Sequence, residues 1–362
     1  MDTDKINNIE AVFLIIIVTL THIILNLPNT ILTSVGSASV LNTFYTSILA
    51  IIFFLIVCKL FKPFENKDII DVAEYVGGTK LKVFTTLLYS FYLIFTSSIL
   101  ILNFSETLQN IYFQNSEVWP IILIFIIVSL FVNKLGFKNV VKVNTLIIPI
   151  TLISVIIIFG ASITKFEPER MLPLIGYGVN KTFISGFSNI FAFGGLLYLF
   201  LIRPNLKNSK DYKKIGIIAI VISAAYLLLS VASLLLQFPF IANGKEVLSV
   251  YLSSRTIEFG KFFQRSDALF IFVWILAFLA YLSVILAYIT KINKKSLNIE
   301  KHSFILYITA ILIFFIAMIP QNVAQIRFLE NTVYKYSALI IVFGYNIILL
   351  IIANLKKRKL SK

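Results

Sequence analysis

Two long apolar stretches of this chain are interrupted near their middle. Residues 185–205 read SGFSNIFAFGGLLYLFLIRPN, where Gly194 and Gly195 interrupt an otherwise apolar segment. The first apolar stretch, residues 11–35, is interrupted by the tripeptide NLP at 26–28. A break inside a membrane span frees backbone groups that only a cavity, a ligand or a neighbouring helix can satisfy. Two such breaks predict a binding site of the transporter type. The alternative is that the glycines only permit close helix packing and the proline marks a helix end.

The composition identifies the class of protein. The 362 residues are 59% hydrophobic, with a mean hydropathy of +0.93, which is far too apolar for a soluble chain of this length. A membrane-spanning helix needs roughly 20 apolar residues. Ten stretches meet this requirement: 11–35, 38–61, 81–112, 118–134, 138–161, 184–203, 213–238, 267–290, 303–319 and 332–354. We therefore predict an all-α polytopic membrane protein, with one transmembrane domain over residues 1–362.

The basic residues are distributed unevenly over the predicted loops. If the N-terminus lies inside, 23 of the 32 lysines and arginines fall on the inner side and 9 on the outer side. This bias predicts that both termini are cytoplasmic, including the basic tail 355–362. Breaks in the first and sixth of ten spans predict two inverted repeats of five helices, at about 11–161 and 184–354.

Several functional classes are excluded by the placement of the polar residues. The net charge of +15 would suit a nucleic-acid partner, but the basic residues lie in short loops between apolar spans and are predicted to face lipid headgroups. Cys58 is the single cysteine, and His22 and His302 are too few and too distant to form a metal site. No nucleophile–base pair or phosphate-binding loop is present. We therefore expect neither an enzyme, nor a cofactor, nor a bound metal.

Two segments outside the spans are predicted to form amphipathic helices. Residues 68–78 (DIIDVAEYVGG) are too short to cross a bilayer and are expected to lie on the inner surface, ending at Gly77-Gly78. Residues 243–266 are expected to contain a helix along the outer surface, because Val247, Leu248 and Tyr251 recur at near-helical spacing.

The residues beside the two breaks are candidates for ligand binding. Asn26 is predicted to cap the half-helix that starts around Pro28, whose free N–H groups suit a carboxylate. Carbonyls freed at the glycine pair suit an ammonium group. The candidates at the breaks are Thr21, His22, Leu25, Asn26, Phe193, Gly194 and Gly195. We expect both glycines to be non-helical and to face residues 26–28. For His22, a neutral side chain bonded inside the bundle is the alternative.

Four stretches carry a family pattern: LNLPN at 25–29, FAFGGLLYLFLIRPNLK at 191–207, RTIEFGKFFQRSDALFIFVW at 255–274 and PQN at 320–322. With them the chain resembles the spore germination permease family, the B subunit of nutrient germinant receptors. This family belongs to the amino acid–polyamine–organocation transporter superfamily. Pro28, Arg255, Arg265, Asp267 and Trp274 are interpreted as structural residues of this pattern.

The resemblance implies a fold and a function. In the superfamily the third and eighth helices face the breaks, and this adds four candidates: Thr96, Ser97, Tyr281 and Ser283. The alternative is that their hydroxyls form hydrogen bonds within their own helices. The implied protein senses a small nutrient such as an amino acid in the spore inner membrane or the cell membrane and triggers germination. Its implied partners are the A subunit and the C lipoprotein subunit of the receptor. The alternative function is a secondary transporter for a small neutral amino acid, which needs the same pocket.

Overall fold

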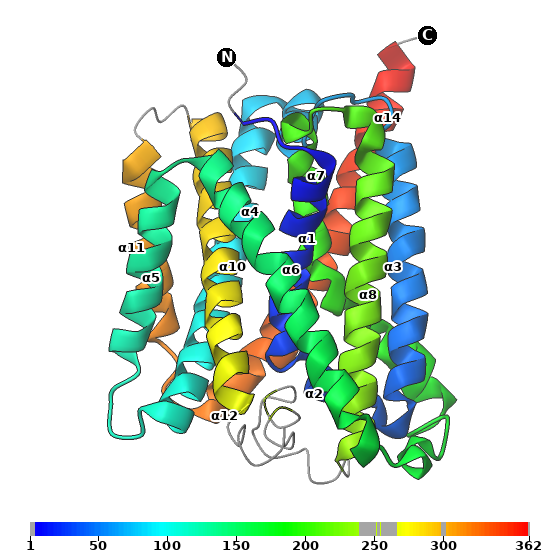
Figure 1. The fold of residues 1–362 in the computed structure, drawn as a ribbon. Helices are drawn as coiled ribbons and strands as arrows, with labels where there is room; N and C mark the ends of the chain where they lie inside the picture. Colours follow the sequence, from blue (N-terminus) through cyan, green and yellow to red (C-terminus); the bar gives the residue numbers. More distant parts are fainter. Residues whose placement is uncertain (1–3, 239–250, 252–253, 255–265, 298–301, 361–362) are drawn as a thin grey trace.

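The computed structural model describes residues 4–238, 251, 254, 266–297 and 302–360. Every regular element in these residues is helical, and a single isolated bridge pairs Ile6 with Leu206. The helices form an upright bundle, in which α1 begins and α14 ends at the same end (Figure 1).

The described residues form α-, π- and 3₁₀-helical elements. The α-helices are α1 (Asn8–Ile24), α2 (Leu27–Val35), α3 (Ser39–Phe61), α4 (Ile69–Tyr112), α5 (Trp119–Lys134), α6 (Phe137–Ser162), α7 (Leu197–Ile202), α8 (Tyr212–Gln237), α10 (Ser266–Leu297), α11 (His302–Ala317), α12 (Val323–Phe328), α13 (Lys335–Ala338) and α14 (Asn346–Leu360). The π-helices are η4 (Asn180–Ile184), η9 (Leu329–Tyr334) and η10 (Leu339–Tyr345). The 3₁₀-helices are η1 (Gly36–Ala38), η2 (Ile163–Lys165), η3 (Pro168–Met171), η5 (Ser185–Leu196), η6 (Arg203–Asn205) and η7 (Ser209–Asp211).

Some of these helices, alone or joined to their neighbours in the chain, are long and apolar enough to cross a membrane. Seven segments of the described chain meet that condition: Leu27–Phe61, Ile69–Tyr112, Phe137–Lys165, Asn180–Asn205, Ser209–Gln237, Phe270–Leu297 and Ala324–Leu360. Three shorter apolar helices accompany them: Asn8–Ile24, Trp119–Lys134 and Ser303–Ala317. Large apolar side chains such as Ile124, Phe131 and Leu146 point outward, as they do in a bundle surrounded by lipid. The protein is therefore a helical, multi-pass membrane protein.

The first predicted break is confirmed. Helix α1 ends at Ile24, and α2 begins at Leu27 with Pro28 in its first turn. Asn26 occupies the N-cap position, but its side chain makes no capping hydrogen bond. The predicted capping role is therefore wrong, because the Asn26 amide turns instead to the carboxylate of Glu330 at 3.3 Å.

The second break has a different form from the one predicted. The chain enters through η4 and continues as η5, a 3₁₀-helix of 12 residues, before the α-helical turns of α7. The non-helical backbone falls at Phe193 (φ −94°, ψ 23°), so the expectation of a non-helical Gly194-Gly195 pair is wrong. The tighter 3₁₀ winding has poorer hydrogen-bond geometry than the α-helix, and such a stretch often marks a functional hinge.

The amphipathic helix predicted at residues 68–78 forms the start of α4. Asp68 accepts a hydrogen bond from the Asp71 N–H at 2.9 Å, while its own N–H donates to the Asp71 carboxylate at 3.1 Å. This capping box fixes the first turn. The predicted end at Gly77-Gly78 is confirmed, because α4 is kinked there and Gly78 has a φ of +66°.

Several other expectations concern residues beyond the described ranges. The described ranges include only positions 251, 254 and 266 of the outer-surface helix predicted at 243–266. Arg255 and Arg265 lie outside the described ranges. Asp267 lies in the first turn of α10. Trp274 is buried in α10, as expected for a structural residue.

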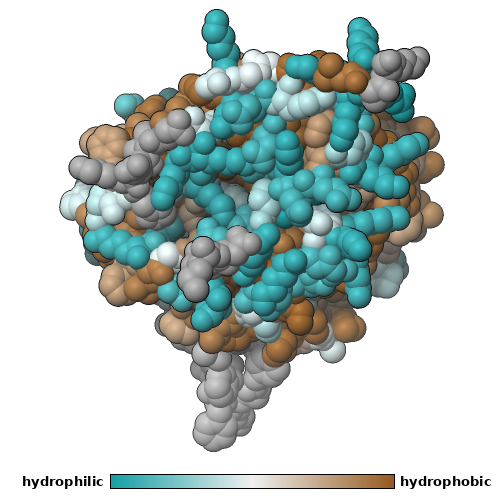
Figure 2. Space-filling view, turned by 90° about the horizontal axis from the view of Figure 1, so that it is seen from above, coloured by the Kyte–Doolittle hydropathy of each residue, from teal (hydrophilic) through white to brown (hydrophobic). Residues whose placement is uncertain are grey.

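The bundle end that holds the start of α1 and the end of α14 is strongly hydrophilic. Figure 2 shows this end covered by hydrophilic residues with apolar residues around the rim. Exposed lysines at the helix ends contribute to it: Lys59, Lys62, Lys134, Lys138, Lys207, Lys210, Lys213, Lys294 and Lys356. We call this surface the polar end. Its basic character agrees with the loop charges counted in the sequence.

Candidate functional site

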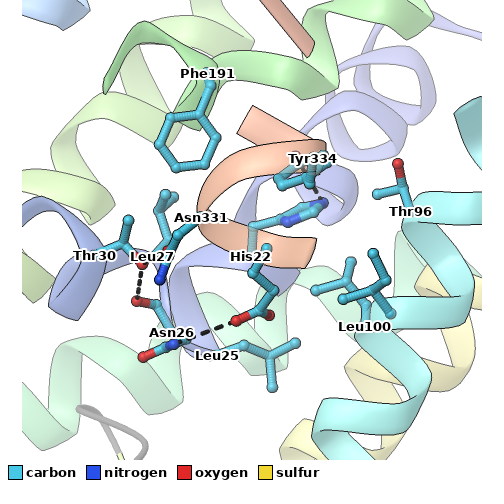
Figure 3. A pocket seen from close by; sticks show the side chains of 12 residues that line it. His22, Leu25, Asn26, Leu27, Thr30, Thr96, Leu100, Phe191, Asn331 and Tyr334 are labelled. Carbon is cyan, nitrogen blue, oxygen red and sulfur yellow. Dashed lines mark hydrogen bonds between the residues drawn. The ribbon is translucent and has the colours of Figure 1, made fainter. Parts of the chain in front are cut away.

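A small cavity lies where the chain of the first break meets η9 (Figure 3). Its volume is about 30 Å³, room for about two water molecules. The lining residues come from α1, α2, α4, η5 and η9: His22, Leu25, Asn26, Leu27, Thr30, Thr96, Ile99, Leu100, Phe191, Glu330, Asn331 and Tyr334. The first break, the second broken span and the last long span therefore meet at one place.

The carboxylate of Glu330 connects three of these elements. Its Oε1 accepts a hydrogen bond from the Asn103 side-chain amide of α4 at 2.6 Å. Its Oε2 accepts one from the Asn26 amide at the first break, at 3.3 Å. Close by, the Thr30 hydroxyl of α2 donates to the Asn331 side-chain oxygen at 3.0 Å. The two hydrogen bonds that join Asn26 to Glu330 and Thr30 to Asn331 hold the start of α2 against η9.

Aromatic rings form another wall of the cavity. The His22 ring stacks on Tyr334, with centroids 5.1 Å apart and planes 7° from parallel. The Phe191 ring meets Tyr334 edge-on at 5.8 Å. Tyr281 touches the other side of His22 edge-on at 5.9 Å. The cavity is therefore lined both by aromatic rings and by a carboxylate and side-chain amides.

The structure brings some of the predicted residues to the cavity. His22, Leu25, Asn26 and Thr96 line it directly. Tyr281 supports it through the His22 ring. Four of the predicted residues therefore line the same cavity, and their role in binding stays a prediction.

Three predicted residues lie elsewhere. Thr21 borders a second cavity of about 10 Å³, together with Trp274 and Phe278. The Ser97 hydroxyl donates to the Leu93 carbonyl at 2.8 Å, and the Ser283 hydroxyl to that of Leu279 at 2.8 Å. Both serines therefore follow the alternative, in which a hydroxyl bonds its own helix.

The two neighbouring glycines have different surroundings. A β-carbon at Gly194 would lie 3.1 Å from the Tyr334 hydroxyl and 3.3 Å from that of Tyr92. A β-carbon at Gly195 would lie only 2.6 Å from the Thr19 hydroxyl. Gly195 therefore packs against α1, and the expectation that it faces residues 26–28 is wrong. Phe193 is buried but does not line the cavity. The aromatic residue of this stretch that lines the cavity is Phe191.

Sequence reasoning missed the residues contributed by η9. Glu330, Asn331 and Tyr334 precede or begin the last predicted span, 332–354, whereas the helical segment extends from Ala324 to Leu360. The boundary placed Glu330 in a loop. A carboxylate within an apolar helix is itself a signal of a functional site. If the last span had been predicted to begin before residue 330, Glu330 would have been recognised as such a carboxylate.

The geometry defines a class of protein. A helical membrane bundle with two interrupted segments beside a cavity is an architecture found in many secondary transporters. The solved structure of a Na⁺-coupled sialic acid symporter, in a substrate-bound outward-open state, has the same fold: the TM-score is 0.68, and the match covers 94% of this chain and 79% of that chain at 11% identity. The chain thus has a transporter-type fold.

The family follows from the sequence comparison. Residues 5–326 match the family described as "Spore germination protein", and the chain belongs to it. Spore germination protein YndE of Bacillus subtilis (strain 168) is 20% identical over 358 residues, which are 98% of both chains. Spore germination protein KB of the same organism is 23% identical over 250 residues; the match spans 67% of this chain and 66% of that protein, just under two thirds of its length. The resemblance drawn from the four sequence stretches is confirmed.

Proposed function

We propose that this protein is the integral membrane subunit of a nutrient germinant receptor in the spore inner membrane. It senses a small nutrient such as an amino acid and triggers germination together with receptor subunits A and C. We further propose ten spans in two inverted repeats of five, with both termini in the cytoplasm. The observation that carries the proposal is the cavity at the first break, lined by Glu330, Asn26 and aromatic rings, in a member of the spore germination protein family.

The size of the cavity supports a sensing mechanism. A space of about 30 Å³ is too small for a whole amino acid, so ligand entry requires α2 and η9 to separate. The bonds from Asn26 to Glu330 and from Thr30 to Asn331 join these two elements and must open. A nutrient that binds only the open arrangement shifts the population toward it. That shift is the signal passed to the partner subunits.

Two matched threonines test this function. The Thr96 and Thr309 hydroxyls each donate to the carbonyl four residues earlier, but only Thr96 lines the cavity. Spores with this receptor as their sole copy are first screened for a response to each of the 20 amino acids. Thr96→Val should then raise the concentration needed for half-maximal germination by about two- to tenfold, the effect of one lost hydrogen bond. Thr309→Val should leave it unchanged.

Subunit abundance in the inner membrane is quantified in parallel by immunoblot. Equal responses of both variants at equal abundance would refute the binding site. If the parent spores respond to none of the nutrients more strongly than spores of a deletion strain do, the receptor function itself is refuted.

The symporter-type fold and the carboxylate in the cavity also favour a second function, a secondary transporter for a small neutral amino acid. Uptake of a radiolabelled amino acid into proteoliposomes separates the two. Accumulation driven by a proton or sodium gradient would favour the transporter. Binding without accumulation would favour the receptor.

A further inference from the structure

Several carboxylates in the described part of the chain form an ion pair, whereas Glu330, like Asp211 at the start of α8, is bonded to asparagine amides. Asp4 pairs with Lys291, Glu74 with Lys82, and both Asp68 and Asp71 with Lys295. Among the described residues, no lysine or arginine forms an ion pair with Glu330. Its partners there are the two uncharged amides of Asn26 and Asn103.

The two amide donors are uncharged, and the Arg327 guanidinium acts on the Glu330 carboxylate only through its charge, without an ion pair. Removing an ionised carboxylate from water is costly unless a cation or several donors compensate it. Each Glu330 oxygen receives one hydrogen bond and therefore keeps a lone pair for another donor. The side chain lies within a helical segment long and apolar enough to span a membrane, where an ionisable side chain is a strong indication of function.

The rest of the cavity favours an organic cation. His22, Phe191 and Tyr334 line the same space as Glu330. Their rings offer contact to the apolar part of a ligand, which an organic cation has and an inorganic ion lacks; the Lys335 ammonium already lies 5.5 Å from the Phe191 ring centroid. The volume of about 30 Å³ in this conformation admits a group the size of an ammonium beside the carboxylate, even though a whole ligand needs a wider opening.

We propose that Glu330 is the anionic subsite of the cavity and binds the ammonium group of an amine-bearing ligand. This inference rests on the proposed nutrient-binding function and specifies its ligand class. Asn26 and Asn103 act as positioning residues, because they hold the carboxylate toward the cavity. The first break, α4 and the last long helical segment thereby contribute to the same recognition element.

The experiment uses the purified full-length protein and ethylammonium chloride as the probe. Thermal unfolding is followed at pH 7 over increasing probe concentrations, with ionic strength held constant by sodium chloride. The midpoint should rise for the parent protein, because a ligand that binds the folded state stabilises it. In Glu330→Gln the apparent Kd should increase about tenfold or more, since a charge-assisted hydrogen bond is replaced by a neutral one. Glu330→Asp, which keeps the charge, should retain the protection.

The control variant is Glu117→Gln, which removes an exposed carboxylate in the connection between α4 and α5. It should bind ethylammonium like the parent. Sodium propionate, which carries no ammonium group, should protect none of the proteins. Absence of protection in the parent, or equal protection in parent and Glu330→Gln, would overturn the assignment. So would equal protection by sodium ions alone, which would make Glu330 an inorganic cation site.

Germination assays separate this inference from the proposed function. If Glu330→Gln loses ethylammonium binding while its spores germinate normally, the subsite stands and the receptor function falls. If deletion of the receptor abolishes the nutrient response while Glu330→Gln binds ethylammonium normally, the receptor stands and the subsite assignment falls.

Discussion

Adjacent residues of one sequence motif can have separate structural roles. Gly194 and Gly195 look equivalent in the sequence, yet one lies near the hydroxyls of Tyr92 and Tyr334 and the other lies against Thr19 of α1. A tyrosine hydroxyl is the end of a long side chain and can shift. Thr19 has a short side chain, and its backbone nitrogen would lie 3.3 Å from a β-carbon at Gly195. Thr19 is therefore much less able to move.

We therefore expect Gly195→Ala to destabilise the bundle and Gly194→Ala to have a smaller effect. Overpacking at a close helix contact costs roughly 1–3 kcal/mol of the free energy of unfolding. The measurement is the thermal unfolding midpoint of each variant in the same detergent. In the double variant Gly195→Ala/Thr19→Ala the hydroxyl at 2.6 Å is gone, and most of the loss should be recovered. Failure of this rescue would show that Thr19 is not the obstacle.

Irregular helical elements surround the cavity. The non-α stretches η5 and η9 supply Phe191, Glu330 and Tyr334, and the gap between α1 and α2 supplies Asn26. Polar partners secure the irregular backbone: the Asn42 amide of α3 donates to the carbonyls of Thr182 at 2.7 Å and Gly186 at 3.0 Å, at the start of the second broken span. Departures from α-helical winding are tolerated in a membrane bundle where such partners exist.

The kink in α4 gives a prediction at the level of one element. Gly78 has φ +66° and ψ −160°, a region that residues with a β-carbon rarely adopt. Gly78→Ala should therefore lower the free energy of unfolding by roughly 1–3 kcal/mol, although no atom obstructs the new methyl group. Gly160→Ala in α6 is the matched control, since its surroundings are equally open and its backbone is helical. That change should be neutral or stabilising, by up to about 1 kcal/mol. Similar unfolding midpoints for the two variants would contradict the strain argument.

The whole molecule is asymmetric along the bundle axis. The polar end carries most of the exposed lysines of the described residues, while the connection between α4 and α5 lies at the opposite end (Figure 1). Lysine side chains at the polar end favour contact with anionic headgroups, and positively charged loops are retained on the cytoplasmic side. The asymmetry therefore favours one orientation in the membrane.

Cysteine labelling tests this orientation. The single native cysteine, Cys58, is first replaced by serine, and single cysteines are introduced at Lys210, Lys294 or Glu117. All three positions are exposed. A membrane-impermeant maleimide applied to intact cells should label the cysteine at 117 and spare those at 210 and 294, which should react after permeabilisation. Labelling of 210 and 294 on opposite faces would refute the proposed topology.

The sequence by itself determined the features that depend on local chemistry. Apolar length identified a multi-pass helical membrane protein, the tripeptide at 26–28 located the first break, and Gly77-Gly78 located the kink of α4. These depend on the hydrophobicity of one segment or on the backbone of a few residues. The family pattern in four stretches was also readable without a structure.

Only the tertiary structure decided which side chains share the cavity. Glu330 is 227 residues from Asn103 and 304 from Asn26, and no local periodicity predicts that these three meet. The same applies to Gly195 and Thr19, because a glycine in a sequence gives no indication of which helix approaches it. Helix packing brings such residues together, and it depends on the shapes of many side chains at once.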